Sequence, residues 1–350
     1  MNKPKSLICR YAIAAMALLG FTSQQAVAST TDYTKYVDPF IGNADNGHTF
    51  PGACRPFGMI QTSPVTGAVG WRYCAEYVYS DSIIWGFTQD HLNGTGCMDL
   101  GDILVMPSTG KRTRSWDGYR SRFNKAQEIA TPGYYSVYLS DAKVKAELTA
   151  SPHVAFHRYT YDSTDSTSVL IDLQHGPAWN DKQYHSQVNV CDTRWEDAYT
   201  LVGHVQNTVW VKQDYFFVLK FNRPFASHIK LAKAADTEKG HRIVATFDGI
   251  GQGEQLLMKV AMSTTSIDGA KKNLAAEVPH WDFAAVKRAA HDEWNTYLKR
   301  IDIDGTEEQK KNYYTSFYHA LIQPNQIADV DGMYRNAADK IVKAETGQFY

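Results

Sequence analysis

The chain has 350 residues and a formal net charge of -1, with 43% hydrophobic and 21% charged residues. The 36 basic and 37 acidic residues nearly cancel, which excludes a general basic nucleic-acid binder and an acidic tail protein, and the apolar content excludes a disordered chain. Aromatic residues make up 13%, a fraction that suits a packed core and also the flat faces of sugar rings.

Residues 1–28 have the pattern of a secretory signal peptide. A positively charged start is followed by a short apolar run over 11–21 and by a small-x-small cleavage site at Ala26-Val27-Ala28. We expect the mature chain to begin near Ser29 and to be exported to the periplasm or the cell exterior. The apolar run is too short to span a membrane, and no later stretch is long enough, so we expect no membrane span.

Two stretches are unusual: Asp38–Pro64, whose Gly and Pro content predicts an ordered loop region, and Trp85–Pro107, which is Gly-rich and polar. The second stretch places His, Asn, Asp and Cys side chains among glycines. Glycine lets the backbone approach a ligand closely, and ordered loops on a rigid scaffold often hold sites.

From Ile103 to about Ser263, apolar and polar residues alternate. This period of two predicts strands with one buried face, separated by turns rich in Gly, Asn and Asp. Many short strands without helices between them predict an antiparallel β-sandwich, which we assign to residues 29–264. The clearest alternating sets are Val144, Ala146, Leu148 and Ala150; Tyr215, Phe217, Leu219 and Phe221; Ile243, Ala245 and Phe247; and Met258, Val260 and Met262.

Near Pro279 the period changes to that of a helix. One apolar stripe contains Phe283, Val286, Ala290, Trp294, Tyr297 and Ile301. A capping box at Thr306–Gln309 predicts a second helix that ends before Pro324, with Tyr313, Phe317 and Leu321 on its core face.

Two amphipathic helices need further helices to bury their stripes. We therefore expect residues 265–350 to be linker helices and the beginning of an incomplete helical domain, in the front part of a longer protein. The alternative is that the helices pack only on the sandwich.

Several chemical interpretations of the loops stay open at this point. Cys97 could be a nucleophile with His91 as its base, and His48 could share a zinc ion with His91. Asp99 and Asp102 could bind a metal or cap turns, of which capping is favoured beside Gly. No pair of carboxylates stands out as a general acid and base.

Three other motifs give weaker signals. Asn93-Gly94-Thr95 is an N-glycosylation sequon. The segment Asp329–Gly332 resembles a calcium loop but lacks the closing Glu, so we expect a tight turn at Asp331-Gly332. Four cysteines follow the predicted cleavage site: Cys54, Cys74, Cys97 and Cys191. They allow three sets of disulfide pairings, and the sequence does not choose among them. No CxxC pair supports a zinc site.

Motifs spread over almost the whole mature chain resemble the N-terminal part of glycoside hydrolase family 92. They are Val37–Gly42, Gly47–Ala53, Pro56–Met59, Gly86-Phe87, His91-Leu92, Gly94–Cys97, Asp99, Gly101–Pro107, Tyr318–Leu321 and Asp329–Tyr334. The resemblance implies a β-sandwich, linker helices and the start of a truncated (α/α)6 toroid. It also implies a calcium-dependent, inverting exo-α-mannosidase acting on N-glycans or mannans. We expect an α-1,2 linkage, with α-1,3 and α-1,6 left open.

The resemblance places the acid, the base and the calcium ligands in the helical domain, and none maps onto these 350 residues. We therefore name no catalytic residue and no metal ligand here, and we expect the 350-residue chain alone to be inactive. The expected sugar contacts are Trp71, His91, Asn93, Gly94, Thr95, Gly96, Cys97 and Asp99, with His48 as a weaker candidate. The mannose-containing glycan is the expected partner, and the oligomeric state stays open.

Two other functions remain as alternatives. A non-catalytic carbohydrate-binding sandwich would have the same aromatic content and the same polar loop. A hydrolase that uses Cys97 as its nucleophile would instead lose its activity on thiol alkylation.

Overall fold

The computed structural model describes residues 31–110, 116–178 and 187–345 of the chain. The chain divides into two units, Met1–Thr31 and Asp32–Tyr350, and all elements given below belong to the second. The predicted signal peptide lies outside the described residues.

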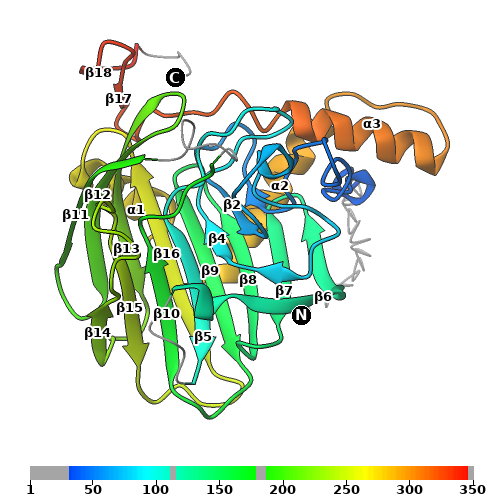
Figure 1. Cartoon of the computed structure of the whole chain (residues 1–350). Helices are drawn as coiled ribbons and strands as arrows, with labels where there is room; N and C mark the ends of the chain where they lie inside the picture. Colours follow the sequence, from blue (N-terminus) through cyan, green and yellow to red (C-terminus); the bar gives the residue numbers. More distant parts are fainter. Residues whose placement is uncertain (1–30, 111–115, 179–186, 346–350) are drawn as a thin grey trace, which may run out of the picture. The chain divides into compact units, whose positions relative to one another are not determined.

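Two antiparallel sheets form most of the second unit (Figure 1). The smaller, seven-stranded sheet has the order β1-β2-β4-β5-β10-β15-β14. Its strands are β1 (Ala53–Cys54), β2 (Gln61–Val65), β4 (Gly86–Thr88), β5 (Leu104–Thr109), β10 (Thr167–Asp172), β15 (Arg242–Phe247) and β14 (Ser227–Lys230). The predicted antiparallel sandwich is thereby confirmed.

The larger, nine-stranded sheet has the order β11-β12-β13-β16-β9-β8-β7-β6-β3. Its strands are β11 (Gln187–Trp195), β12 (Thr200–Thr208), β13 (Lys212–Phe221), β16 (Gln255–Ser263), β9 (Val154–Tyr161), β8 (Val144–Ala150), β7 (Tyr134–Leu139), β6 (Ser121–Thr131) and β3 (Ile83–Ile84). A separate hairpin is made by β17 (Met333–Arg335) and β18 (Ile341–Lys343), and three short 3₁₀ helices are η1 (Thr34–Tyr36), η2 (Trp71–Tyr73) and η3 (Trp116–Tyr119).

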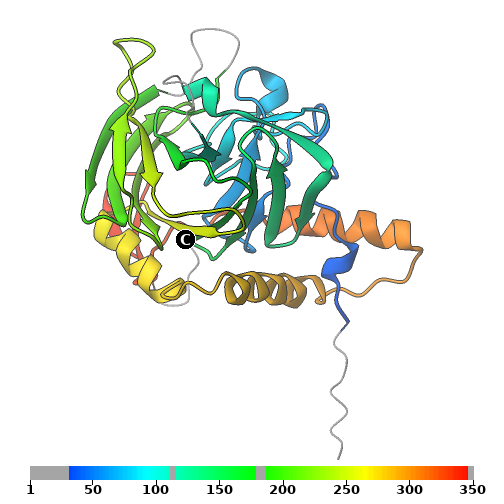
Figure 2. The same cartoon turned by 90° about the horizontal axis from the view of Figure 1, so that it is seen from below.

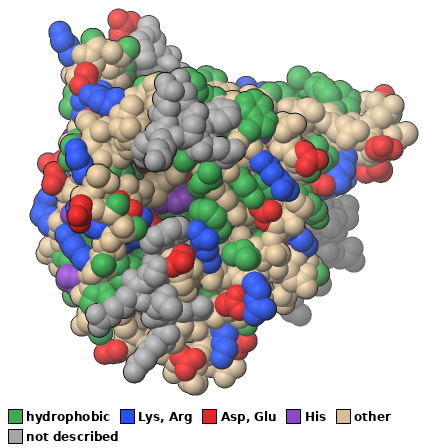
Figure 3. Space-filling view, in the orientation of Figure 1, with side chains coloured by type: hydrophobic (Ala, Val, Ile, Leu, Met, Phe, Trp, Pro, Cys, Tyr) green, Lys and Arg blue, Asp and Glu red, His purple; other side chains and the backbone are tan. Residues whose placement is uncertain are grey.

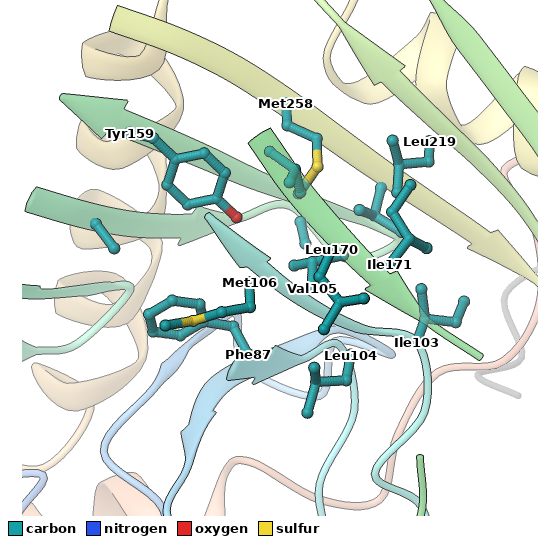
Figure 4. Packing of buried hydrophobic residues seen from close by; sticks show 14 of the residues in the cluster. Phe87, Ile103, Leu104, Val105, Met106, Tyr159, Leu170, Ile171, Leu219 and Met258 are labelled. Carbon is teal, nitrogen blue, oxygen red and sulfur yellow. The ribbon is translucent and has the colours of Figure 1, made fainter. Parts of the chain in front are cut away.

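The core lies between the sheets, where alternating side chains of both meet. Figure 4 shows Val105 and Leu170 of the smaller sheet beside Leu219 and Met258 of the larger one. All four side chains are almost completely buried. The period of two therefore specifies the inner face, as the sequence predicts.

The outer face of the larger sheet is also partly buried, which the alternation alone did not indicate. On β8, Glu147 and Thr149 point away from the core and are nevertheless buried. The Glu147 carboxylate accepts hydrogen bonds from Tyr134 Oη at 2.7 Å and Arg158 Nε at 2.8 Å. The expectation of one buried face is wrong here, because helices cover this side of the sheet (Figure 2).

The stretch Asp38–Pro64 is not entirely loop as predicted, because it contains β1 and most of β2. The Pro content argued against a strand, yet Pro64 pairs with Phe87 of β4. On the other side β1 pairs only with Gln61 and Thr62, so Pro64 has no ladder partner there. A residue without an N–H group is tolerated at such an unpaired edge.

Three helices follow the sandwich: α1 (Ile267–Glu277), α2 (Phe283–Leu298) and α3 (Glu307–Ala320). The last sandwich strand, β16, ends at Ser263. Helix α1 lies at the start of the segment 265–350 expected to hold linker helices, although no helical period located it; it starts where Ser266 Oγ accepts a hydrogen bond from Gly269 N at 3.0 Å. The predicted capping box at Thr306 and Gln309 opens α3 and is confirmed.

The predicted stripe of α2 is largely correct. Phe283, Val286, Ala290 and Trp294 are buried as expected. The helix ends at Leu298, however, so Leu298 completes the buried stripe and Ile301 lies beyond the helix, exposed.

The predicted core face of α3 is wrong by one residue. Tyr314, Thr315 and Tyr318 are buried, whereas Tyr313 and Phe317 are half-buried. Tyr318 packs against Trp294 of α2 with ring centroids 4.4 Å apart, which fixes the orientation of the helix. Hydrophobic side chains are therefore left accessible over α3 (Figure 3).

Candidate functional site

The Gly-rich loop of residues 91–100 is closed at its base by backbone pairing. His91 and Leu100 form an isolated antiparallel bridge. Directly below, Asp90 Oδ1 accepts hydrogen bonds from Gly101 N at 3.1 Å and Asp102 N at 2.7 Å. The loop is thus held as a defined structure on the rim of the sandwich.

Asp90 and Asp102 form a buried carboxylate pair that the sequence did not reveal. Burial raises the pKa of Asp90 to about 6, and burial together with the neighbouring Asp90 charge raises the pKa of Asp102 well above its ordinary value. Asn207 donates a hydrogen bond to Asp102. Both carboxylates lie beneath the loop and are almost completely buried, and within the described residues Oδ2 of each forms no hydrogen bond.

His91 lies in the interior behind the loop. Its Nδ1 is 2.8 Å from Gln61 O, so this nitrogen carries the proton, and its Nε2 lies 3.0 Å from Thr88 Oγ1. Burial lowers the pKa of His91, and the Glu76 carboxylate, whose Oε2 is 3.4 Å from Nε2, opposes this shift. Both ring nitrogens have protein partners, so His91 positions the loop and is not available as a base for Cys97.

A second buried pair supports the loop from below. His175 Nε2 lies 2.7 Å from Glu76 Oε1, and Thr88 Oγ1 donates to Glu76 Oε2 at 2.9 Å. Burial disfavours the charged form of each group, but the charge and hydrogen bond of the partner outweigh the effect of burial. The pKa of Glu76 is therefore lowered, and that of His175 is raised. A Cβ at Gly101, whose φ is +86°, would overlap the Glu76 carboxylate.

Trp71 and His48 form the aromatic part of the site, of which Trp71 is accessible and His48 is buried. Trp71, at the start of η2, is 43% exposed, and its Nε1 donates to Asn46 Oδ1 at 3.1 Å. The His48 ring meets the Trp71 ring edge-on with centroids 4.9 Å apart. A Cβ at Gly96 would overlap the Trp71 ring, so glycine is required for the loop to lie against the indole.

Asn93 connects the loop to the helical part of the chain. Its Nδ2 donates to His319 O, at the end of α3, at 3.3 Å. His319 Nε2 in turn lies 3.1 Å from Ile41 O. The backbone N–H of Gly94 donates to His48 O at 2.6 Å. Three segments that are distant in the sequence, those of His48, Asn93 and His319, therefore meet.

Polar atoms without partners gather at this meeting point. Within the described residues, both ring nitrogens of His48, Oδ1 of Asn93 and Nδ1 of His319 are buried and form no hydrogen bond. His48 and Asn93 are only 6% and 9% exposed. Buried polar groups are normally paired, so their concentration beside Trp71 is what a polar ligand would satisfy.

Backbone strain also concentrates here. His48, Glu76, Leu100 and Ile103 all have positive φ although none is glycine. Such conformations cost free energy and persist where the surrounding structure imposes them, often at functional sites.

Cys97 and Asp99 lie at the far side of the loop. Burial and the neighbouring Asp99 raise the pKa of the Cys97 thiol, which disfavours the thiolate that a nucleophile needs. Burial raises the pKa of Asp99, whose carboxylate is hydrogen-bonded to Gln213 and to the backbone of Val211. Asp99 thereby connects the loop to the β12–β13 hairpin. Trp210 of this hairpin is half exposed and was not named among the candidate site residues predicted from the sequence.

The predicted metal alternatives find no support in the described residues. They contain no group of three or more His, Cys, Asp and Glu side chains placed to hold a metal ion. The Asp329 carboxylate accepts hydrogen bonds from Ser263, Thr265 and Asn273 at 2.7 to 2.8 Å, and Gly332 N donates to Asp329 O at 2.7 Å. This segment is the predicted tight turn and not a calcium loop.

All four described cysteines are free. None of the helices among the described residues has the length and apolar character needed to cross a membrane.

Comparison with known proteins identifies the two parts of the chain. Residues 36–263 match the glycosyl hydrolase family 92 N-terminal domain, and residues 269–350 match the family 92 catalytic domain. An uncharacterized secreted glycosidase from Arthroderma benhamiae is 23% identical over 90% of this chain and 44% of its own length.

Solved structures show the same fold. The family 92 α-mannosidase BT3965 from Bacteroides thetaiotaomicron is 30% identical, with a TM-score of 0.82 over 90% of this chain and 44% of that protein. The inverting mannosidase BT2199 from the same species is 24% identical, with a TM-score of 0.72 over 90% of this chain and 42% of that protein. The chain thus spans less than half the length of these relatives.

Proposed function

The chain belongs to glycosyl hydrolase family 92, and we propose that it is the N-terminal part of an exported, calcium-dependent, inverting exo-α-mannosidase. The proposed substrates are mannose-terminated N-glycans or mannans, with an α-1,2 linkage favoured. The α-mannosidase BT3965, a structural relative, has been solved in complex with mannoimidazole, which supports a mannose-like ligand.

One observation carries the proposal for this part of the protein. Trp71 offers an accessible indole face beside the unpaired polar atoms of His48, Asn93 and His319. A sugar presents apolar C–H faces and a rim of hydroxyls, so an aromatic ring with directed polar groups matches both. We propose that Trp71, His48 and Asn93 contact the sugar, together with the backbone of Gly94, Thr95 and Gly96.

The other predicted residues act through the loop in this proposal. His91 and Asp99 hold the two sides of the loop, and Cys97 is part of the loop between them. Each would change activity by displacing the contact surface, not by touching the reacting atoms.

An inverting glycosidase needs one carboxylic acid to protonate the leaving oxygen and one carboxylate to activate water on the opposite face. The family resemblance places both groups in the helical domain, so we propose that both catalytic groups lie outside residues 29–350. Calcium, which would stabilise a distorted sugar ring when bound, would likewise be held by ligands outside the described residues. Residues 29–350 alone are then inactive, and their role is to bind and orient the glycan.

The proposed contacts can be tested in the protein read through to its natural stop. Hydrolysis of α-1,2-, α-1,3- and α-1,6-mannobiose is measured for the native protein and for W71A, N93A and the control Y199A. Tyr199 is a similarly exposed aromatic residue on the β11–β12 hairpin. We expect W71A and N93A to lower kcat/KM by about tenfold or more, as for loss of a 1.4 kcal/mol contact, and Y199A to leave it unchanged. Equal activity of all four proteins would refute the contact assignment.

A further inference from the structure

A pocket lies on the outer face of the larger sheet, covered by α1. Its volume is about 380 Å³, within the range of small-molecule sites. Its walls include Val218 and Lys220 of β13, Lys259 of β16 and the segment after α1 with Val278 and Trp281. Lys220 is eight residues along β13 from Lys212, about 26 Å in an extended strand, and no residue of the loop cluster lines the pocket.

Two cations face each other across the strands of this pocket. Lys220 and Lys259 are directly paired in the register of β13 and β16. Like charges at directly opposed positions destabilise a sheet. Within the described residues, neither lysine has a carboxylate at ion-pair distance. Glu196, at the rim of the pocket, pairs with Arg194 and Lys271. The Asp197 side chain, also at the rim, accepts a hydrogen bond from Tyr199 N at 2.7 Å.

Lys259 is the less accessible of the two. It is 3% exposed; its Nζ donates to Val278 O at 2.8 Å and lies 4.0 Å from the centre of the Trp281 ring. Burial, together with Lys220, lowers its pKa to about 8, so the ammonium form still predominates at neutral pH. A buried ammonium whose hydrogen-bond partner is a neutral carbonyl can gain stability from an anion.

We propose that this pocket binds a small organic anion, a carboxylate or a phosphate carried on a ring-sized body. The anionic group would lie between Lys220 and Lys259. The body would pack against Trp281, Val218 and Val278, which supply the apolar part of the wall. This site is separate from the proposed sugar contacts and does not depend on them.

Isothermal titration calorimetry at constant ionic strength tests the proposal on the purified chain. The probes are benzoate, phenyl phosphate and, as a neutral analogue, benzyl alcohol. The variants are K259M, K220M and the control K239M, which replaces an exposed lysine outside the pocket. Near-UV circular dichroism checks that each variant is folded. If K259M does not fold, K220M alone still tests the proposal.

We expect saturable binding of one or both anions, weakened at least about tenfold in K259M and K220M and unchanged in K239M. The tighter anion identifies the preferred charged group. Binding should also weaken as the pH rises through about 8, when Lys259 loses its proton. Absence of anion binding, equal binding of benzyl alcohol, or unchanged binding in both lysine variants would overturn the proposal.

Discussion

At the scale of residues, the Gly-rich loops were predictable but the roles of their side chains were not. Glycine density marked the segment around Gly96, where the close approach of Trp71 requires it. The sequence could not separate His91, whose ring nitrogens both have partners, from His48, whose ring nitrogens have none, because both are single histidines in similar surroundings. It also could not reveal the Asp90–Asp102 pair, since burial raises these pKa values and burial depends on the complete fold.

The contact between Gly96 and Trp71 predicts the effect of one methyl group. In G96A the new Cβ would overlap the indole, so the ring must move. We expect a loss of about 1–3 kcal/mol in the free energy of unfolding and a raised KM for mannosides in the read-through protein. Urea denaturation and steady-state kinetics measure these. G251A is the control, because its Cβ meets nothing within 4 Å; equal behaviour of the two variants would contradict the contact.

The Glu76–His175 pair predicts a specific pH dependence of stability. The pKa of His175 is raised above its ordinary 6.5, so its contribution is complete below pH 6.5 and is lost as the pH rises through the raised value. The pKa of Glu76 is lowered from 4.5, so its contribution is complete above pH 4.5 and is lost as the pH falls through the lowered value. Both contributions are therefore complete between pH 4.5 and 6.5.

Chemical denaturation of the native chain and H175Q at pH 5.5 and 8.5 tests this pair. The native chain should exceed H175Q in stability by more at pH 5.5 than at pH 8.5, and E76Q should remove the same pH dependence. A stability difference that does not change with pH would show that His175 is not protonated in the folded chain at pH 5.5.

At the scale of elements, hydrophobic periodicity predicted the types of strand and helix better than their environments. The period of two located β8, β13, β15 and β16, but it could not reveal that helices cover the outer side of β8. The stripe of α3 was displaced by one residue, because aromatic residues occur at both Tyr313 and Tyr314 and only tertiary packing on Trp294 selects the buried set. Periodicity did not locate helix α1 within the expected linker helices, because its buried face contains Gly269, Ala270 and Asn273, not large apolar residues.

Asp329 connects the corner between β16 and α1 to the turn after α3. D329A would leave the groups of Ser263, Thr265 and Asn273 without their buried acceptor. We expect a loss of about 3 kcal/mol in the free energy of unfolding, measured by urea denaturation. The matched variant D331A removes an exposed ion pair with Lys272 and should cost less than about 1 kcal/mol. Equal losses, or a loss of stability on adding EDTA, would contradict the structural role of Asp329.

At the scale of the whole molecule, the sandwich followed by helices was predictable from the change of period near Pro279. Hydrogen bonds between distant segments then join the two parts of the chain. Phe57 N donates to Leu321 O at 2.9 Å, and Trp294 Nε1 donates to Cys54 O at 2.8 Å, so both join the sandwich to the helices. The sequence alone could not predict that Asn93 would meet His319, because 226 residues separate them.

The central claim is that these residues form the sugar-contacting part of an α-mannosidase whose catalytic groups lie elsewhere. Its most direct test measures mannose release from α-linked mannobioses by residues 29–350 and by the protein read through to its natural stop, each with calcium or with EDTA. We predict that only the longer protein releases mannose and that EDTA stops it. Mannose release by residues 29–350 alone would contradict the claim, because the acid and base would then lie within them. If neither protein hydrolyses mannobiose but both bind it, the carbohydrate-binding alternative replaces the enzyme.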